Sequence, residues 1–169
     1  MKLKFTIPSL LVFLLFMGIH TSQAQKNAYV DSSLILSQMQ EVKQAEATLE
    51  TLQKKLQSQG QAKVEAFQKR LEKIQDEIAQ GLLTPKQQEE ESNKFEVEQN
   101  AIAKFEQDMV SKIKNKRSEL LEPIYAKIDA AISQVAKENS IDMVFDKTNI
   151  LFGLEALDLT SKVKAKLGL

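Results

Sequence analysis

Few residues in this chain of 169 have the types and spacing needed for catalysis. The chain has no cysteine, and its one histidine, His20, lies in an apolar N-terminal segment that we expect to be removed. The remaining chain would then lack the commonest general base, a thiolate nucleophile and the usual zinc ligands. Its five glycines form neither a GxxxxGKS/T nor a GxGxxG pattern, so nothing indicates a bound nucleotide. Because the carboxylates are scattered along predicted helices, we expect no enzyme activity, no metal and no cofactor.

The N-terminus has the features of a secretory signal peptide. A short basic opening precedes an almost wholly apolar run, residues 5–19, which is shorter than the roughly 20 residues of a membrane-spanning helix. Small residues at Ser22 and Ala24 are typical of a cleavage site, so residues 1–24 form the predicted signal. The alternative is an uncleaved membrane anchor.

The predicted mature chain, residues 25–169, is slightly acidic. The whole chain has 23 basic and 23 acidic residues, and two lysines leave with the signal. This balance disfavours non-specific binding to nucleic acid.

A long antiparallel helical hairpin, residues 41–122, is the main predicted element. Its two helices carry apolar residues at steps of three and four, which is the spacing of a coiled-coil seam. An eleven-residue step from Leu56 to Phe67 interrupts the heptads and contains Gly60. The seam residues are Val42, Ala45, Leu49, Leu52, Leu56, Val64, Phe67, Leu71, Ile74 and Ile78 in the first helix, and Phe95, Ile102, Phe105, Met109, Ile113, Leu120, Ile124, Ile128, Ile132 and Val135 in the second.

Four residues predict a tight turn at the tip of the hairpin. Gly81 suits the left-handed position after a helix, and Thr84 suits the N-cap of the next one. Pro85 fits the first helical position, and Gln87 would complete a capping box with Thr84.

The position of this turn predicts which residues face each other. If the turn is centred on Leu82 and Leu83, Gly60 faces Phe105, so the smallest residue lies against one of the largest. Each arm has about 40 residues and a length of about 60 Å at 1.5 Å per residue. Pro123 should kink the second helix where it leaves the hairpin, because it cannot bond the carbonyl of Glu119.

Segments from the two ends of the chain should form a small β-body at the hairpin base, residues 25–40 and 123–169. We expect three short strands, at 26–31, 141–146 and 149–152, with a short helix after the first and another at the C-terminus. Three strands and two thin helices bury little apolar surface in one copy, which points to an oligomer. The candidate body and oligomer core residues are Ala28, Val30, Ile141, Val144, Phe145, Ile150 and Phe152.

Four parts of the sequence carry a resemblance to a known family. They are residues 28–32 with Ile35 and Met39, residues 82–85, residues 123–146, and residues 158–160 with Val163 and Leu167. In order and spacing they resemble the Skp/OmpH periplasmic chaperones over nearly all of the mature chain. The resemblance implies a periplasmic homotrimer of the α+β class, mostly α, in which a β-body carries three hairpin tentacles around a cavity. It also implies that unfolded outer-membrane proteins are held there without ATP.

The tentacles of the best-known members are basic, whereas this outer hairpin is acidic. Residues 60–100 hold six bases and nine acids, so we expect only indirect or weak contact with the membrane. Leu82, Leu83 and Phe95 are the candidate client contacts; for Phe95 the alternative is packing within the hairpin. Residues 86–94 include no large apolar residue, which predicts a loosely closed tip. A basic cluster at residues 112–117 either guides acidic client segments or is a solvated face.

Other classes of function remain open. The main alternative to a chaperone is a structural or adaptor coiled-coil protein that docks on a complex of the cell envelope. A lipid-surface protein is a further alternative, which the acidic outer hairpin disfavours.

Overall fold

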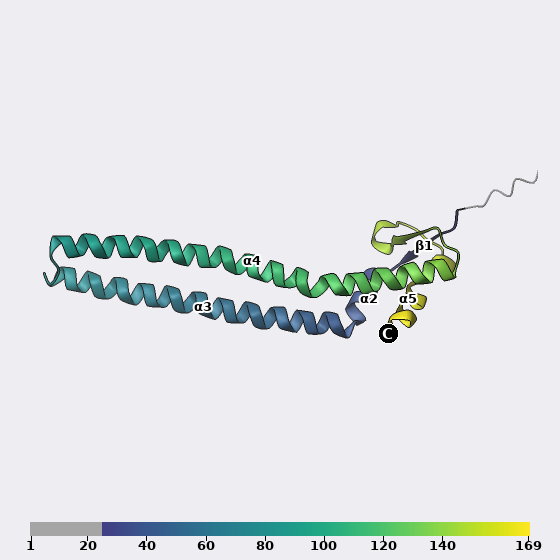
Figure 1. The fold of residues 1–169 in the computed structure, drawn as a ribbon, viewed down its shortest axis with the longest axis horizontal. Coiled ribbons are helices and arrows are strands. Elements are labelled where there is room, and N and C mark those ends of the chain that lie inside the picture. The colour runs from purple at the N-terminus through teal and green to yellow at the C-terminus, as the bar shows by residue number, and fades with distance from the viewer. Residues whose placement is uncertain (1–24) are drawn as a thin grey trace, which may run out of the picture.

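The computed structural model describes residues 25–169, and the predicted signal peptide, residues 1–24, lies outside them. Two long helices, α3 and α4, run side by side from a tip to a small body in which both ends of the described chain lie (Figure 1). The predicted mostly helical α+β fold with a long hairpin is confirmed. Among residues 25–169 no helix is both long and apolar enough to cross a membrane.

The hairpin consists of α3, Gln40–Ala79, and α4, Pro85–Glu138. With 40 residues, α3 has the predicted length of about 60 Å at 1.5 Å per residue. Near the body the seam is buried, at Ala45, Leu49 and Leu56 of α3. From Gly60 out to Ile74, the seam residues of α3 are only half-buried. Burial therefore declines along the arm towards the tip.

The tip has the predicted turn chemistry. Gly81 has φ +70°, and its N–H donates to the carbonyl of Ile78 at 3.0 Å, while the N–H of Leu82 donates to the carbonyl of Glu77 at 2.9 Å. These two bonds form a Schellman motif, which satisfies carbonyls at the end of α3. Thr84 and Gln87 form the expected capping box, with Pro85 at the first position of α4.

The predicted pairing of the two helices is confirmed at Gly60. A Cβ atom added there would lie 3.3 Å from Cε1 of Phe105. One seam residue near the tip was assigned wrongly: Ile78 is exposed, and Glu77 is half-buried in its place.

The body is built from both ends of the described chain. Strand β1, Asn27–Val30, pairs in parallel with β2, Met143–Asp146. Helix α2, Ser32–Gln38, follows β1, and Asp31 caps it by accepting a hydrogen bond from the N–H of Leu34 at 2.9 Å. Helix α5, Thr160–Leu167, ends the fold. The core they share with α3 and α4 comprises Ala28, Val30, Ile35, Met39, Ala45, Ile124, Ile128, Ala131, Val135, Leu159 and Val163.

One expectation about the body needs correction. The third strand, predicted at 149–152, is absent: the chain forms a 3-10 helix over Lys147–Asn149 and then an irregular segment. Asp146 sets this turn locally, because its carboxylate accepts hydrogen bonds from the N–H and the hydroxyl of Thr148. Helix α4 continues through Pro123 into the body core, so the proline lies within the helix where the kink was expected. Figure 1 shows α4 changing direction where it approaches the body.

Candidate functional site

The tip of the hairpin places two of the three predicted contact residues at its surface. The side chain of Leu82 is 64% exposed, and Leu83 is half-buried. Both lie in the connection between the Schellman motif of α3 and the capping box of α4, which fixes the backbone on either side. The arm therefore ends in an exposed leucine on an ordered turn.

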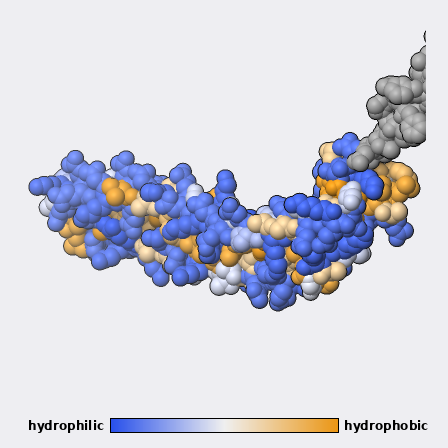
Figure 2. Space-filling model, turned by 45° about the vertical axis from the view of Figure 1, so that its right-hand side comes forward, coloured by the Kyte–Doolittle hydropathy of each residue, from blue (hydrophilic) through white to orange (hydrophobic). Residues whose placement is uncertain are grey.

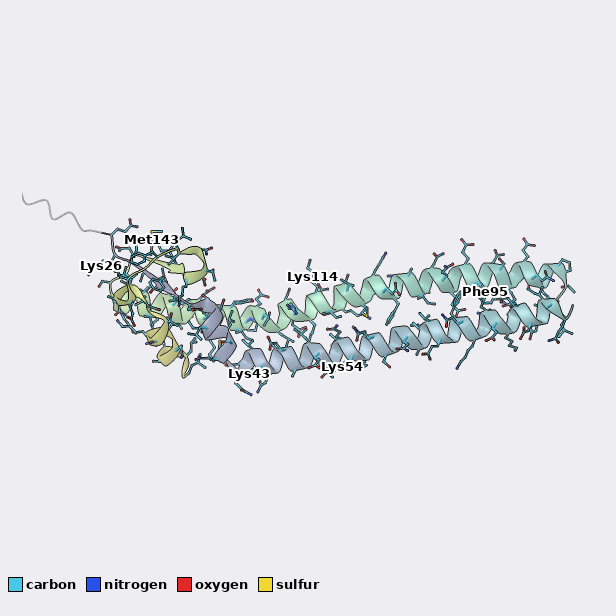
Figure 3. All side chains as sticks on the ribbon, turned by 180° about the vertical axis from the view of Figure 1, so that it is seen from behind. Lys26, Lys43, Lys54, Phe95, Lys114 and Met143 are labelled. Atoms are coloured by element: carbon cyan, nitrogen blue, oxygen red, sulfur yellow. The ribbon has the colours of Figure 1, made fainter. Side chains whose placement is uncertain are left out.

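Phe95, the third predicted contact, is engaged inside the hairpin. Its ring meets the ring of Phe67 edge to face, with centroids 5.6 Å apart. The guanidinium carbon of Arg70 lies 5.1 Å from the centroid of the Phe95 ring. Figure 3 shows the Phe95 side chain between the two helices. The packing alternative thus describes the observed position of this residue.

Arg70 also joins the two helices through carboxylates. One guanidinium nitrogen lies 2.6 Å from Glu91 and another lies 3.0 Å from Glu98, both on α4. Lys94 adds a 2.7 Å bond to Glu91. The bonds from Lys94 and from Arg70 lower the pKa of Glu91 below its usual value. We refer to Arg70, Glu91 and Glu98 as the clasp.

Sequence reasoning missed the clasp because it counted only apolar seam residues. A signal was present, since Arg70 follows Phe67 by three residues and lies opposite Phe95 when the chain is folded about the tip. A basic residue at a seam position, facing two acids seven residues apart and therefore on the same face of the other helix, indicates such a pair. The clasp fastens the hairpin just where the lack of large apolar residues predicted a loose tip.

The predicted body-core residues separate into two groups. Ala28 and Val30 are buried, and Ile141 and Val144 pack half-buried against the same core. The other three, Phe145, Ile150 and Phe152, line a surface pocket of about 300 Å³ with Tyr29 and Leu157.

This pocket belongs to a wider apolar surface on the body. Phe152 is 82% exposed, although it is a large aromatic residue next to a well-packed core. Figure 2 shows apolar side chains gathered on the body beside the described N-terminus. We refer to the exposed apolar residues of this region as the body patch: Met143, Phe145, Leu151, Phe152, Leu154 and Leu157.

Gly153 allows the loop that carries the patch to lie close to β1. A Cβ atom on it would stand 2.6 Å from Cε1 of Tyr29, which no side chain tolerates without a shift. Tyr29 in turn bridges to Asp158, and its carbonyl accepts the N–H of Leu159 at 2.8 Å. The loop is thereby fixed at both of its contacts with β1, while its apolar side chains stay at the surface.

Acidic residues of the described chain do not gather into a metal-binding centre. Among residues 25–169 there is no group of three or more acidic, histidine or cysteine side chains that could hold a metal ion. The features that distinguish this protein are thus a long clasped arm, an exposed leucine at its tip and the body patch.

Comparison with known proteins identifies the family. The model of the OmpH-like outer membrane protein family matches residues 26–167, which is almost the whole described chain. The chain belongs to the OmpH-like family. This assignment confirms the resemblance found in the sequence.

A solved structure shows the same fold in another OmpH-like protein. It is a protein of Caulobacter crescentus considered an OmpH-like outer membrane chaperone, with a TM-score of 0.72 and 16% sequence identity. The match covers 89% of the present chain and 88% of the other. No curated protein matches the present chain.

Proposed function

We propose that this OmpH-like protein is a periplasmic holdase, which binds unfolded outer-membrane proteins without ATP and prevents their aggregation. One observation carries the proposal: an arm of about 60 Å, by helix rise, extends from a small body that leaves a large apolar patch exposed. Arms of this kind suit a client that has no fixed shape, because they offer many weak contacts along their length. The OmpH-like structural neighbour, considered a chaperone, supports the same role.

The body patch supports assembly into a homotrimer. A two-stranded sheet with an open edge is a poor independent structure, and exposed strand edges tend to pair with other chains. Contiguous apolar surface of this kind on an otherwise polar protein typically marks a protein interface. Phe145, Ile150 and Phe152, which are not enclosed within one copy, would then be covered by neighbouring copies.

Three arms around one client would bind more tightly than any single arm. Once one arm has engaged, the others act at a high effective concentration, and avidity can exceed single-site affinity by about 10² or more. Leu82 and Leu83 at the tips are the proposed client contacts. Phe95 is not included among these contacts, because its ring already packs against Phe67 and Arg70.

A direct test is suppression of aggregation of a urea-unfolded outer-membrane β-barrel protein diluted into buffer without ATP. We expect the wild-type protein to suppress light scattering at about one trimer per client. Leu82→Ser should weaken this suppression several-fold, and Leu169→Ser, a matched change at the C-terminus, should leave it unchanged. Scattering that is unaffected by the wild-type protein would refute the holdase and favour a structural or adaptor role.

The assembly is tested separately by sedimentation equilibrium. We expect three times the chain mass for the wild-type protein, and a lower mass for Phe152→Asp, because a charge in a covered apolar interface is costly. Leu169→Asp is the matched control and should remain trimeric. A wild-type monomer, or a Phe152→Asp trimer of wild-type stability, would contradict this use of the body patch.

A further inference from the structure

The first described residue, Gln25, has a side chain that can react with its own backbone nitrogen. Removal of the predicted signal, residues 1–24, would leave Gln25 at the N-terminus with a free α-amine. From that nitrogen to the side-chain amide carbon Cδ, a glutamine has the number of atoms needed to close a five-membered ring. Anywhere else in a chain the same nitrogen belongs to a peptide bond and cannot attack. Cleavage between Ala24 and Gln25 therefore creates a reactive terminus.

The backbone next to Gln25 is anchored on the body. The N–H of Lys26 donates to a carboxylate oxygen of Asp142 at 2.8 Å. The carbonyl of Lys26 accepts the N–H of Asp142 at 2.8 Å and the N–H of Met143 at 3.4 Å. Strand β1 begins at the next residue, Asn27. Gln25 is thus the residue at which the hydrogen-bonded backbone of the body ends.

The side chain of Gln25 is exposed and weakly held. Within residues 25–169 its amide nitrogen Nε2 makes one hydrogen bond, to Sδ of Met143 at 2.9 Å. A thioether sulfur is a weak acceptor. Release of Nε2 therefore breaks one weak contact, after which the amide can turn towards the α-amine.

The ring closure needs no second reactant. The uncharged α-amine attacks Cδ, the N–Cδ bond forms and the Cδ–Nε2 bond breaks, and Nε2 leaves as ammonia with the proton that the α-amine gives up. An α-amino group has an ordinary pKa of about 8, so about a tenth of it is uncharged and nucleophilic at pH 7. Because both groups belong to one residue, the step avoids the entropy cost of bringing two molecules together.

The surroundings of the terminus favour the closed form. Apolar side chains gather on the body beside the described N-terminus (Figure 2), and Met143, which contacts Gln25, is a member of the body patch. An ammonium group at this place would have to keep its water next to a surface that the proposed trimer covers. Ring closure replaces the ammonium by a neutral lactam.

We propose that the mature protein carries a pyroglutamyl N-terminus, formed by cyclisation of Gln25 after the signal is removed. The inference rests on export of the chain, which is part of the proposed function. A lactam has no primary amine, so it gives aminopeptidases no starting point. This protection has value here because only two residues of the mature chain precede β1, whose Ala28 and Val30 are buried in the body core. Loss of Lys26 alone would remove its hydrogen bonds with Asp142 and Met143.

Mass spectrometry of the exported protein tests the modification. The full chain, residues 1–169, is produced in a Gram-negative host, purified from the periplasm and held at neutral pH. Cleavage before Asp31 then releases residues 25–30 as a peptide. We expect this peptide to lose one molecule of ammonia, and its α-amine to become inert to amine-labelling reagents while the Lys26 side chain still reacts. Gln25→Asn is the matched control and should keep a reactive α-amine, because its shorter side chain would have to close a four-membered ring.

A synthetic peptide of residues 25–30 supplies the reference rate. Because Gln25 lies outside the anchored backbone, we expect the folded protein to cyclise within tenfold of the rate of this peptide. A slower rate in the folded protein, or an α-amine that stays reactive, would overturn the proposal.

Digestion with an aminopeptidase tests the protective role. The cyclised wild-type protein should keep its mass and its melting temperature, whereas Gln25→Asn should be trimmed into β1 and melt several degrees lower. The same result for the two proteins, whether trimmed or intact, would overturn the protective role.

These outcomes are separable from those of the holdase proposal. Cleavage between Ala24 and Gln25 that leaves a lasting free α-amine refutes the cyclisation alone. A chain that is not exported or not cleaved refutes the cyclisation together with the periplasmic location. A cyclised protein that does not suppress client aggregation leaves this inference standing and refutes the holdase.

Discussion

Gly60 gives the sharpest test of how the two helices pack. Because a Cβ atom there would lie 3.3 Å from the Phe105 ring, a leucine at this position must push the ring aside. Overpacking of this kind costs about 1–3 kcal/mol. Replacing glycine within a helix gains about 0.8 kcal/mol from propensity, so Gly60→Leu alone should cost between about 0 and 2 kcal/mol. The single variant is therefore not decisive.

The double variant separates the two contributions. In a Phe105→Ala background the ring is gone, so Gly60→Leu keeps the propensity gain and loses the overpacking. The two changes should then show a favourable coupling of about 1–3 kcal/mol. Urea unfolding measures this coupling free energy. All variants are compared at the same protein concentration, because association adds to stability.

Val110→Ala supplies the control for this cycle. Val110 lies on the same helix but is 64% exposed, so its removal should not couple to Gly60→Leu. A coupling below about 0.5 kcal/mol between Gly60→Leu and Phe105→Ala would be ordinary additivity and would refute the pairing of these two positions.

Three further predictions concern the tip and the body. Arg70→Gln should remove the clasp and speed amide hydrogen exchange around Phe95, whereas Lys69→Gln, a neighbouring exposed change, should not; equal exchange in both would show that the clasp does not fasten the tip. Gly81→Ala should cost about 1 kcal/mol in urea unfolding, since an L-residue is strained at φ +70°, and no change would contradict the Schellman geometry. Hydrogen bonds from Ser32, the larger contribution, and from Thr148 hold the pKa of Asp146 below its ordinary 3.8. The charged carboxylate therefore stabilises the fold above pH 4, and this stabilisation is lost as the pH falls through the lowered pKa. Melting curves between pH 7 and pH 2.5 should therefore fall less steeply for Asp146→Asn than for the wild-type protein; parallel curves would contradict this assignment.

The parts of the fold that sequence predicted well depend on local chemistry. The turn at the tip needs only a glycine that can adopt a positive φ and a capping box within four residues, and Gly81, Thr84 and Gln87 provide both. The pairing of Gly60 with Phe105 followed from the position of that turn, which sets the residues at the same level, and from the apolar seam, which sets the faces that meet.

The parts that sequence missed depend on partners that are distant along the chain. A strand at 149–152 would have to pair with a strand from elsewhere in the chain, and the local turn at Asp146 diverts the segment instead. The clasp was missed for a related reason: Arg70 is polar, and only its contact with two carboxylates on the other helix gives it a structural role. For the candidate site, sequence identified the exposed tip, but the surface position of Phe152 emerges only from the folded body.

The described contacts indicate an arm whose two ends differ in the forces that hold them. At the base, Ile124 and Ile128 of α4 are buried in the body core, and apolar burial is insensitive to moderate salt. Further out, the seam is half-buried and the clasp is an ion pair around a 37% exposed Arg70 side chain, so salt screens it. Salt that screens the clasp therefore loosens the outer arm and leaves the base closed.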